Sequence, residues 1–216
     1  MQPKRVGTPI VHFPSTSKIY SEPYGSVLIM APWNYPLQLA LVPLAGCIAA
    51  GNCAVVKPSN YSPATSAVIK KIITENFPPE YISVAEGGPE VNQDLLDQPF
   101  DYIFFTGGTT VGKLVMEKAA KNLTPVTLEL GGKSANIIFP DAKWDMMLDG
   151  IQLGILFNQG QVCCAGSRIF VHVDIYDKFV QDACEAFGKV KVGLPWEDDT
   201  QMGSQINKGQ MEKILQ

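Results

Sequence analysis

The chain contains 216 residues, 46% of them hydrophobic and 18% charged, which is ordinary for a globular protein with a buried core. A formal net charge of −4 and the absence of any run of lysines or arginines leave no basic surface for DNA or RNA, so we expect no nucleic acid partner. The five cysteines are odd in number and have no CxxC or Cys/His ligand spacing, which indicates reduced thiols and no metal site.

The N-terminal sequence MQPKRVGTPI lacks the apolar segment of a secretory signal, so we expect a cytoplasmic protein. Residues 37–56 approach the length of a membrane span, but Pro43, Gly46, Gly51 and Asn52 interrupt them. We therefore expect an amphipathic helix followed by a buried strand, and no membrane span.

The first 22 residues are extended and punctuated by prolines, which predicts an arm or oligomerisation ribbon that needs a partner surface. From residue 23 to residue 130 short apolar strands alternate with helices. Strands are expected at 25–30, 52–57, 81–86, 101–107 and 125–132, with helices from about Leu37, Pro63 and Thr109 and a short one before residue 101. This rhythm is typical of a parallel sheet covered on both faces, so we predict a Rossmann-like nucleotide-binding domain.

Residues 131–216 continue the alternation, with strands at 135–139 and 167–173 and helices at 144–157 and 175–187. This predicts the first part of a second α/β domain, a partial catalytic domain. The chain stops at MEKILQ, in an expected helix with no cap or glycine stop, so we expect a truncated polypeptide.

The stretch FFTGGTTVG carries a hydrophobic strand into glycines and then into a helix. Glycine lets a backbone approach a phosphate closely, and the free N–H groups and dipole of a helix N-terminus favour an anion. The pattern is G-x-x-x-x-G and differs from the G-x-G-x-x-G dinucleotide fingerprint. A plain turn between strand and helix is the alternative.

Lys57 and Asn34 each follow or end a predicted strand. Pro58 restricts Lys57 to an extended conformation at the rim where ligands bind in parallel sheets, although a solvated surface lysine would have the same sequence. Asn34 lies between Pro32 and Pro36, so its fixed amide can donate to an oxyanion or can cap the following helix.

Glu129 lies inside the apolar run LELGGK, where flanking leucines are expected to desolvate it. A desolvated carboxylate can serve as a general base, and a buried structural salt bridge is the alternative. Gly131 and Gly132 leave it room to move.

Cys163 and Cys164 are adjacent in the stretch FNQGQVCCAGSR. A cysteine nucleophile must be ionised, but the histidines are only His12 in the arm and His172 in a strand, so a Cys/His hydrolase is poorly supported. Two small buried residues are the alternative interpretation of the pair.

Together these segments closely resemble the aldehyde dehydrogenase superfamily, from about residue 20 to residue 216. The resemblance rests on the G-Q-x-C-x-A part of the cysteine motif, which in outline is F-x-N-x-G-Q-x-C-x-A, on E-L-G-G-K, on P-W-N and on the cofactor lysine, which occur here in the family's order. The cysteine motif aligns with NQGQVCCA so that Cys163 is the nucleophile and Cys164 its variable neighbour.

The resemblance implies NAD(P)-dependent oxidation of an aldehyde to a carboxylic acid through a thiohemiacetal and a thioester on Cys163. Asn34 would hold the oxyanion and Glu129 would activate water. The cofactor, NAD or NADP, would lie against Lys57, Ser59, Gly107, Gly108, Thr109 and Gly112. The full-length form is expected to be a homo-oligomer, with the ribbon near residues 10–21 as a pairing element.

The sequence also departs from the family. Asn60 stands where many members have a glutamate that repels a 2′-phosphate, so NADP is as well supported as NAD. Gly108 replaces a common serine. The chain resembles the class 3 or fatty-aldehyde type up to about Leu128, whereas the cysteine motif resembles the betaine and retinal types.

Two alternative functions remain open. A CoA-acylating dehydrogenase shares the cysteine but needs no water-activating acid, so Glu129 argues against it. A truncated, non-catalytic fragment that at most binds nucleotide is consistent with the missing segments, which include a Glu-x-Phe segment that grips the nicotinamide ribose.

Overall fold

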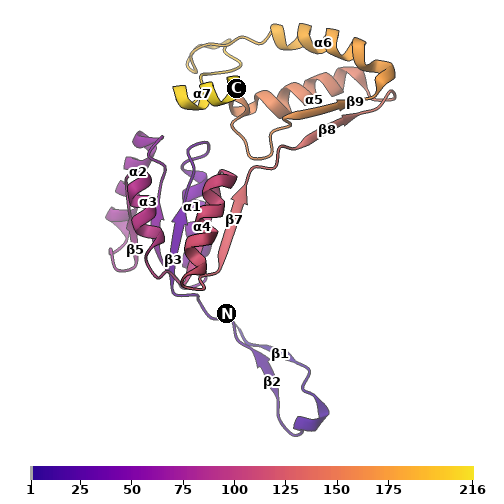
Figure 1. Cartoon of the computed structure of the whole chain (residues 1–216). Coiled ribbons are helices and arrows are strands. Elements are labelled where there is room, and N and C mark those ends of the chain that lie inside the picture. Colours follow the sequence, from indigo (N-terminus) through magenta and orange to yellow (C-terminus); the bar gives the residue numbers. More distant parts are fainter. Residues whose placement is uncertain (1) are drawn as a thin grey trace.

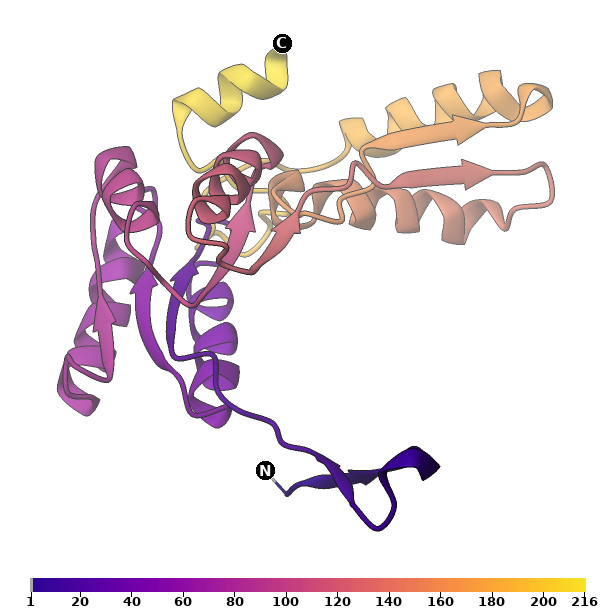
Figure 2. The same cartoon turned by 60° about the horizontal axis from the view of Figure 1, so that its bottom comes forward.

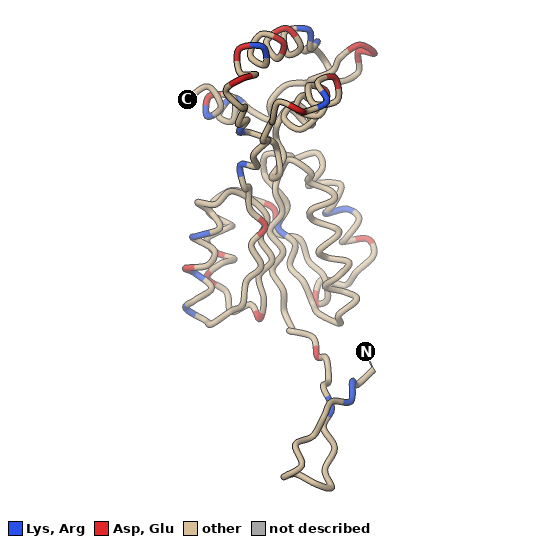
Figure 3. The backbone as a smooth tube through the Cα atoms, turned by 90° about the vertical axis from the view of Figure 1, so that its right-hand side faces the viewer, with Lys and Arg blue, Asp and Glu red and all other residues tan. Residues whose placement is uncertain are grey.

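The computed structural model describes residues 2–216. Two α/β units are joined by residues 131–134, and a two-stranded ribbon projects from the opposite end of the first unit (Figures 1 and 2). Charged residues of both signs occur in both units (Figure 3).

The first unit is built on a sheet of five parallel strands. They are β3 (Ser26–Met30), β4 (Cys53–Lys57), β5 (Ile82–Val84), β6 (Tyr102–Gly107) and β7 (Val126–Leu130). Their order across the sheet is β5-β4-β3-β6-β7, so β3 is central and β5 and β7 are the edges. The predicted parallel Rossmann-like sheet is confirmed.

Helices cover both faces of this sheet because alternate residues of each strand point to opposite sides. On one face α1 (Gln38–Ala49) and α2 (Pro63–Asn76) pack on Val27, Ile29 and Val56. On the other face α3 (Pro89–Leu96) and α4 (Thr109–Ala120) pack on Leu28, Met30 and Ile103. Each fully buried aliphatic side chain contributes about 1.5–3 kcal/mol, so the two cores hold the sheet rigidly beneath its loops.

Helix α1 differs from the amphipathic helix that the sequence predicts. Ala40, Leu44 and Cys47 are buried against the sheet, but the outward side is also apolar and Val42 is 63% exposed. The prediction of an amphipathic helix is wrong because Pro43 and Gly46 break up the run without supplying a polar face. The prediction of a buried strand after it holds for β4, in which Val56 is fully buried.

The second unit contains two parallel strands, β8 (Ala135–Ile138) and β9 (Arg168–Val171). Helices α5 (Trp144–Leu156) and α6 (Tyr176–Gly188) pack together on one face around a small core of Ile138, Ile151, Phe179 and Ala183. The remaining elements are the 3-10 turns η2 (Phe157–Gly160) and η3 (Val173–Ile175) and the helix α7 (Lys208–Leu215).

The N-terminal arm forms a ribbon, as expected, with β1 (Lys4–Val6) antiparallel to β2 (Ser17–Ile19) and the 3-10 turn η1 (Ile10–His12) at its tip. Ile10 and Phe13 at this tip are 89% and 85% exposed. The division of the chain at residues 22 and 130 stays a prediction.

Candidate functional site

The candidate site lies at the carboxyl edge of the five-stranded sheet. Met30 at the end of β3 pairs with Lys57 of β4 on one side and with Phe105 of β6 on the other. The loops that leave β3, β4 and β6 therefore begin side by side. Chain connections diverge to the left and right of β3 at this point, which is where ligands bind in open parallel sheets.

Lys57 is a buried residue, with only 4% of its surface exposed. Its Nζ donates a hydrogen bond of 2.9 Å to the carbonyl of Pro58, and burial lowers the pKa of its ammonium group. The solvated-lysine alternative is therefore wrong. An ammonium group has three N–H donors, so Lys57 keeps donors available for a ligand at the sheet edge.

Ser59 is also buried and stands at the start of a small hollow of about 180 Å³. Its hydroxyl accepts a hydrogen bond of 3.2 Å from the backbone N–H of Tyr61. The hollow is lined by Pro58, Ser59, Asn60, Pro63, Ser66, Glu86 and Gly87. It joins the end of β4 to the end of β5, and no motif in the sequence indicates that Glu86 belongs here.

The glycine turn after β6 leads directly into α4, as the sequence predicts. A Cβ atom at Gly107 would lie 2.5 Å from Cζ of Phe105, and one at Gly112 would lie 2.8 Å from Cδ2 of Leu130. A Cβ at Gly108 would meet nothing within 4 Å. Glycine is therefore needed at two positions for packing, while Gly108 leaves open space before the helix.

The N-terminus of α4 has no side-chain cap, and Thr109 in its first turn is exposed. Just before it, the buried hydroxyl of Thr106 has no hydrogen-bond partner among the described residues. An uncapped helix start and a free buried hydroxyl, at the same edge of the sheet as buried Lys57, fit the phosphates and sugars of a nucleotide.

Asn34 connects the first unit to the cysteine loop. Its side-chain nitrogen donates a hydrogen bond of 2.8 Å to the backbone carbonyl of Gln161. In return the side chain of Asn158 donates to the carbonyl of Asn34 at 3.1 Å. Asn34 is not a helix cap, because the residue before α1 is Leu37. Its amide has a second N–H that this bond does not use.

The cysteine loop is approached through an unusual turn. Asn158 and Gln159 have φ angles of 49° and 57°, and Gly160 follows at 72°. Left-handed conformations of non-glycine residues cost about 1 kcal/mol each and concentrate at functional sites. Asn158, the asparagine of the cysteine motif, is a site residue that the motifs alone did not indicate, and its side chain holds the loop to Asn34.

Cys163 is exposed and lies beside the loop that follows β7. The backbone N–H of Gly132 donates a hydrogen bond of 3.1 Å to the carbonyl of Cys163. Glu129 lies three residues earlier in β7 and is exposed, so the predicted desolvation by neighbouring leucines is wrong. Leu128 and Leu130 pack in the α3–α4 core, and Glu129 therefore points to the other face of an edge strand.

The structure also bears on two alternative interpretations. Glu129 is in no ion pair with the described residues, which excludes a buried structural salt bridge within them. Cys164 is exposed like Cys163, so the pair is not two buried core residues. Cys164 lines an apolar hollow of about 300 Å³ with Leu153, Phe157 and Val162.

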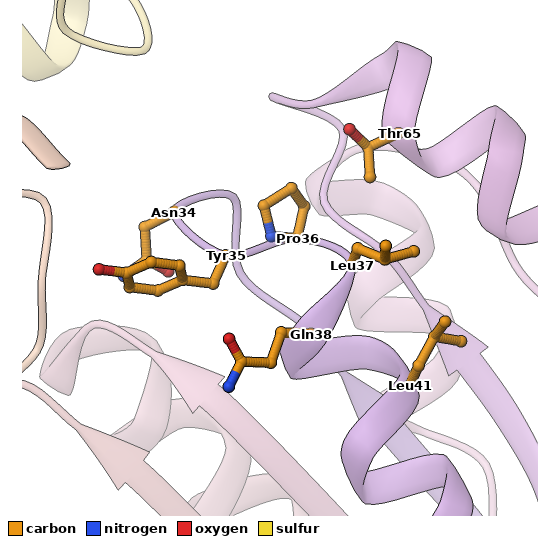
Figure 4. A pocket seen from close by; sticks show the side chains of 7 residues that line it. All are labelled: Asn34, Tyr35, Pro36, Leu37, Gln38, Leu41 and Thr65. Atoms are coloured by element: carbon orange, nitrogen blue, oxygen red, sulfur yellow. The ribbon is translucent and has the colours of Figure 1, made fainter.

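A further open hollow of about 570 Å³ lies along the start of α1. Asn34 and Tyr35 lie at one end of it and Thr65 of α2 at the other (Figure 4). Its lining is mostly apolar and contains neither cysteine of the loop. Asn34 is thus the residue that this hollow shares with the site.

Two further observations concern the residues from 2 to 216. No helix among them has the length and apolar character needed to cross a membrane. They also contain no cluster of three or more histidine, cysteine, aspartate or glutamate side chains arranged to hold a metal ion.

Comparison with characterised proteins gives consistent matches over almost the whole chain. Residues 5–216 match the profile of the aldehyde dehydrogenase family. The 4,4'-diaponeurosporen-aldehyde dehydrogenase of Staphylococcus aureus (strain NCTC 8325 / PS 47) is 49% identical over 177 residues, which cover 82% of this chain and 39% of that protein.

Solved structures show the same relation. Substrate-bound AldH of Staphylococcus aureus has a TM-score of 0.89 and 42% identity, over 99% of this chain and 46% of that one. The Staphylococcus aureus betaine aldehyde dehydrogenase in complex with NAD⁺ has a TM-score of 0.91 and 39% identity, over 98% of this chain and 42% of that one. An NAD⁺ complex of a Bacillus cereus aldehyde dehydrogenase has a TM-score of 0.90 and 34% identity, over 100% of this chain and 44% of that one. The chain spans less than half of the length of each of these relatives, and it belongs to the aldehyde dehydrogenase family.

Proposed function

We propose that this chain is the nucleotide-binding and nucleophile-bearing part of an NAD(P)-dependent aldehyde dehydrogenase. The observation that carries the proposal is the meeting of three motifs that are far apart in the sequence. Asn34 bonds to Gln161 at 2.8 Å and Gly132 bonds to Cys163 at 3.1 Å, so the P-W-N and E-L-G-G-K segments both contact the cysteine loop.

The proposed reaction begins when the thiolate of Cys163 attacks the carbonyl carbon of the aldehyde and forms a C–S bond. The second N–H of Asn34 and the backbone N–H of Cys163 are the donors available for the oxyanion of this thiohemiacetal. A bound NAD(P)⁺ would supply the hydride acceptor, and loss of a hydride from the thiohemiacetal carbon leaves the substrate as a thioester on Cys163.

The thioester is then hydrolysed. Glu129 takes a proton from a water molecule, the hydroxide attacks the thioester carbon, and the C–S bond breaks to release the carboxylic acid and the thiolate. The exposed position of Glu129 on an edge strand allows water to reach its carboxylate. The glycines that follow it in the loop have room to adjust.

The nucleotide would be held along the carboxyl edge of the sheet. Buried Lys57 and Ser59 would contact the ribose on the adenine side, and Gly107, Gly108, Thr109 and Gly112 would accommodate the pyrophosphate at the start of α4. The Staphylococcus aureus and Bacillus cereus relatives were solved in complex with NAD⁺, which supports a nicotinamide nucleotide as the cofactor. The exposed ribbon tip supports homo-oligomerisation of the complete protein.

The test compares Cys163→Ala with its matched neighbour Cys164→Ala in the complete protein. We expect Cys163→Ala to abolish aldehyde oxidation and esterase turnover, because the cysteine motif puts the nucleophile at this residue. Cys164→Ala should keep most of both activities. Equal loss in both variants, or loss only at Cys164, would show that the nucleophile has been assigned one residue out.

Glu129→Gln in the same assay separates hydrolysis from acyl transfer to coenzyme A. If Glu129 activates water, the Glu129→Gln variant must accumulate the thioester on Cys163. Mass spectrometry after rapid quenching detects this thioester. Unchanged turnover in Glu129→Gln, with acyl-CoA formed when coenzyme A is present, would favour the CoA-acylating alternative.

A further inference from the structure

We propose that Glu86 supplies negative charge at the ribose end of the nucleotide site and thereby selects NAD over NADP. This inference rests on the proposed function and identifies a specificity-determining residue for it. Asn60 by itself removes a carboxylate that would repel a 2′-phosphate. Glu86 lines the same hollow as Asn60 and brings a carboxylate back to it.

The sheet brings Glu86 to this place. Strand β5 pairs with β4 in parallel, with Val84 opposite Val56, and the N–H of Ala85 donates to the carbonyl of Val56 at 3.0 Å. The two loops that follow these strands therefore leave the sheet together. Glu86 and Asn60 consequently line the same hollow of about 180 Å³.

The hollow is continuous with the residues expected to hold the ribose. Ser59 is part of its lining, and buried Lys57 immediately precedes that lining at Pro58. A phosphate on the 2′-oxygen would add up to two negative charges beside Glu86. A free 2′-hydroxyl is instead a donor that a carboxylate can accept.

Lys70 of α2 forms an ion pair with Glu86 at 2.7 Å. Glu86 lines the hollow, whereas Lys70 is outside its lining and 51% exposed. We therefore expect the pair to hold the carboxylate in place and to offset only part of its charge for a ligand in the hollow. The partial exposure of Glu86 predicts an effect that salt reduces.

The experiment measures binding of NAD⁺ and NADP⁺ by isothermal titration calorimetry to the complete protein and to its Glu86→Gln variant. We expect native protein to bind NAD⁺ more tightly, and Glu86→Gln to strengthen NADP⁺ binding roughly fivefold with NAD⁺ affinity changed by less than about twofold. The gain should shrink at high salt. Asn60→Glu should weaken NADP⁺ binding further.

Glu75→Gln is the matched control, because Glu75 is also paired with a lysine of α2, Lys71, at 3.9 Å and lies outside the hollow. It should leave both affinities unchanged. Adding Lys70→Gln to Glu86→Gln should preserve the gain for NADP⁺. Loss of that gain would show that a freed lysine caused it and would overturn the inference.

An unchanged ratio of the two affinities in Glu86→Gln would also overturn the inference while leaving the proposed function intact. Failure of the native protein to bind either nucleotide would instead contradict the proposed function at its cofactor site. The two failures differ in the measurement, because the first is an unchanged ratio of affinities and the second is an absence of binding.

Discussion

Lys57 shows how much one position depends on its surroundings. It ends a strand in the sequence VVKPSN, and the following proline keeps it extended, so its location at the sheet edge follows from local rules. Its burial does not follow from local rules, because burial of a side chain depends on segments that are distant in the sequence. Burial lowers the pKa of its ammonium group, which makes the charged form less favourable in the folded protein.

This lowered pKa predicts a pH dependence of stability. Between the folded pKa of Lys57 and its unfolded value of about 10.4, the unfolded chain binds more protons, so the free energy of unfolding rises with pH across that window. We expect Lys57→Met to abolish this part of the rise. Chemical denaturation of both proteins from pH 7 to pH 10 measures it, with the exposed Lys121→Met as control. Parallel curves for native protein and Lys57→Met would contradict the prediction.

At the scale of elements, the contact between α4 and β7 positions the proposed pyrophosphate site. Gly112 faces Leu130 so closely that a Cβ atom would lie 2.8 Å from its Cδ2. The helix can approach the strand only because this residue has no side chain. The same approach places the first turn of α4 at the carboxyl edge, next to Thr106 and Gly107.

Substitution at Gly112 should therefore disturb both stability and nucleotide binding. We expect Gly112→Val to lower the free energy of unfolding by about 1–3 kcal/mol, because the larger side chain overpacks the contact with Leu130. Nucleotide affinity should fall as α4 is displaced. Denaturation and calorimetry measure the two effects.

Gly46→Val is the matched control for this change. Gly46 is also inside a helix of the first unit, but a Cβ there would meet nothing within 4 Å. It should leave the free energy of unfolding unchanged or slightly raised, because valine has a somewhat higher helix propensity than glycine. Equal losses at Gly46 and Gly112 would show that the contact with β7 does not set the effect.

At the scale of the whole molecule, large apolar side chains remain exposed in two regions. On the two-stranded sheet of the second unit, Ile137 and Phe170 are 68% and 53% exposed, because helices cover only one face of β8 and β9. At the ribbon tip, Ile10 and Phe13 are exposed. Apolar patches of this kind mark surfaces that bind other protein.

We expect the 216-residue chain, expressed alone, to self-associate and to show little or no aldehyde oxidation. Light scattering measures its mass, and the formation of NADH or NADPH measures turnover. The double variant Ile137→Thr with Phe170→Thr should reduce association, whereas Leu123→Thr, an isolated residue that is 89% exposed, should not. A monomeric native chain with normal turnover would contradict this prediction.

The sequence by itself determined the alternation of strands and helices and the parallel sheet, and its cysteine motif predicts Cys163 as the nucleophile. These features depend on local hydrophobic periodicity and on contiguous motifs, which are complete within short segments. The ribbon followed from its prolines and its extended composition in the same way.

Only the tertiary structure decided which of these segments meet. Glu129 is exposed because β7 is an edge strand, Asn34 holds the carbonyl of Gln161, and Glu86 shares a hollow with Asn60 because β5 lies beside β4. The exposure of Glu129, the hydrogen bond of Asn34 and the hollow shared by Glu86 and Asn60 each depend on residues of another strand or of the other unit. Strand order sets those neighbours, and the residues of a strand encode its burial pattern but not the strand that lies next to it.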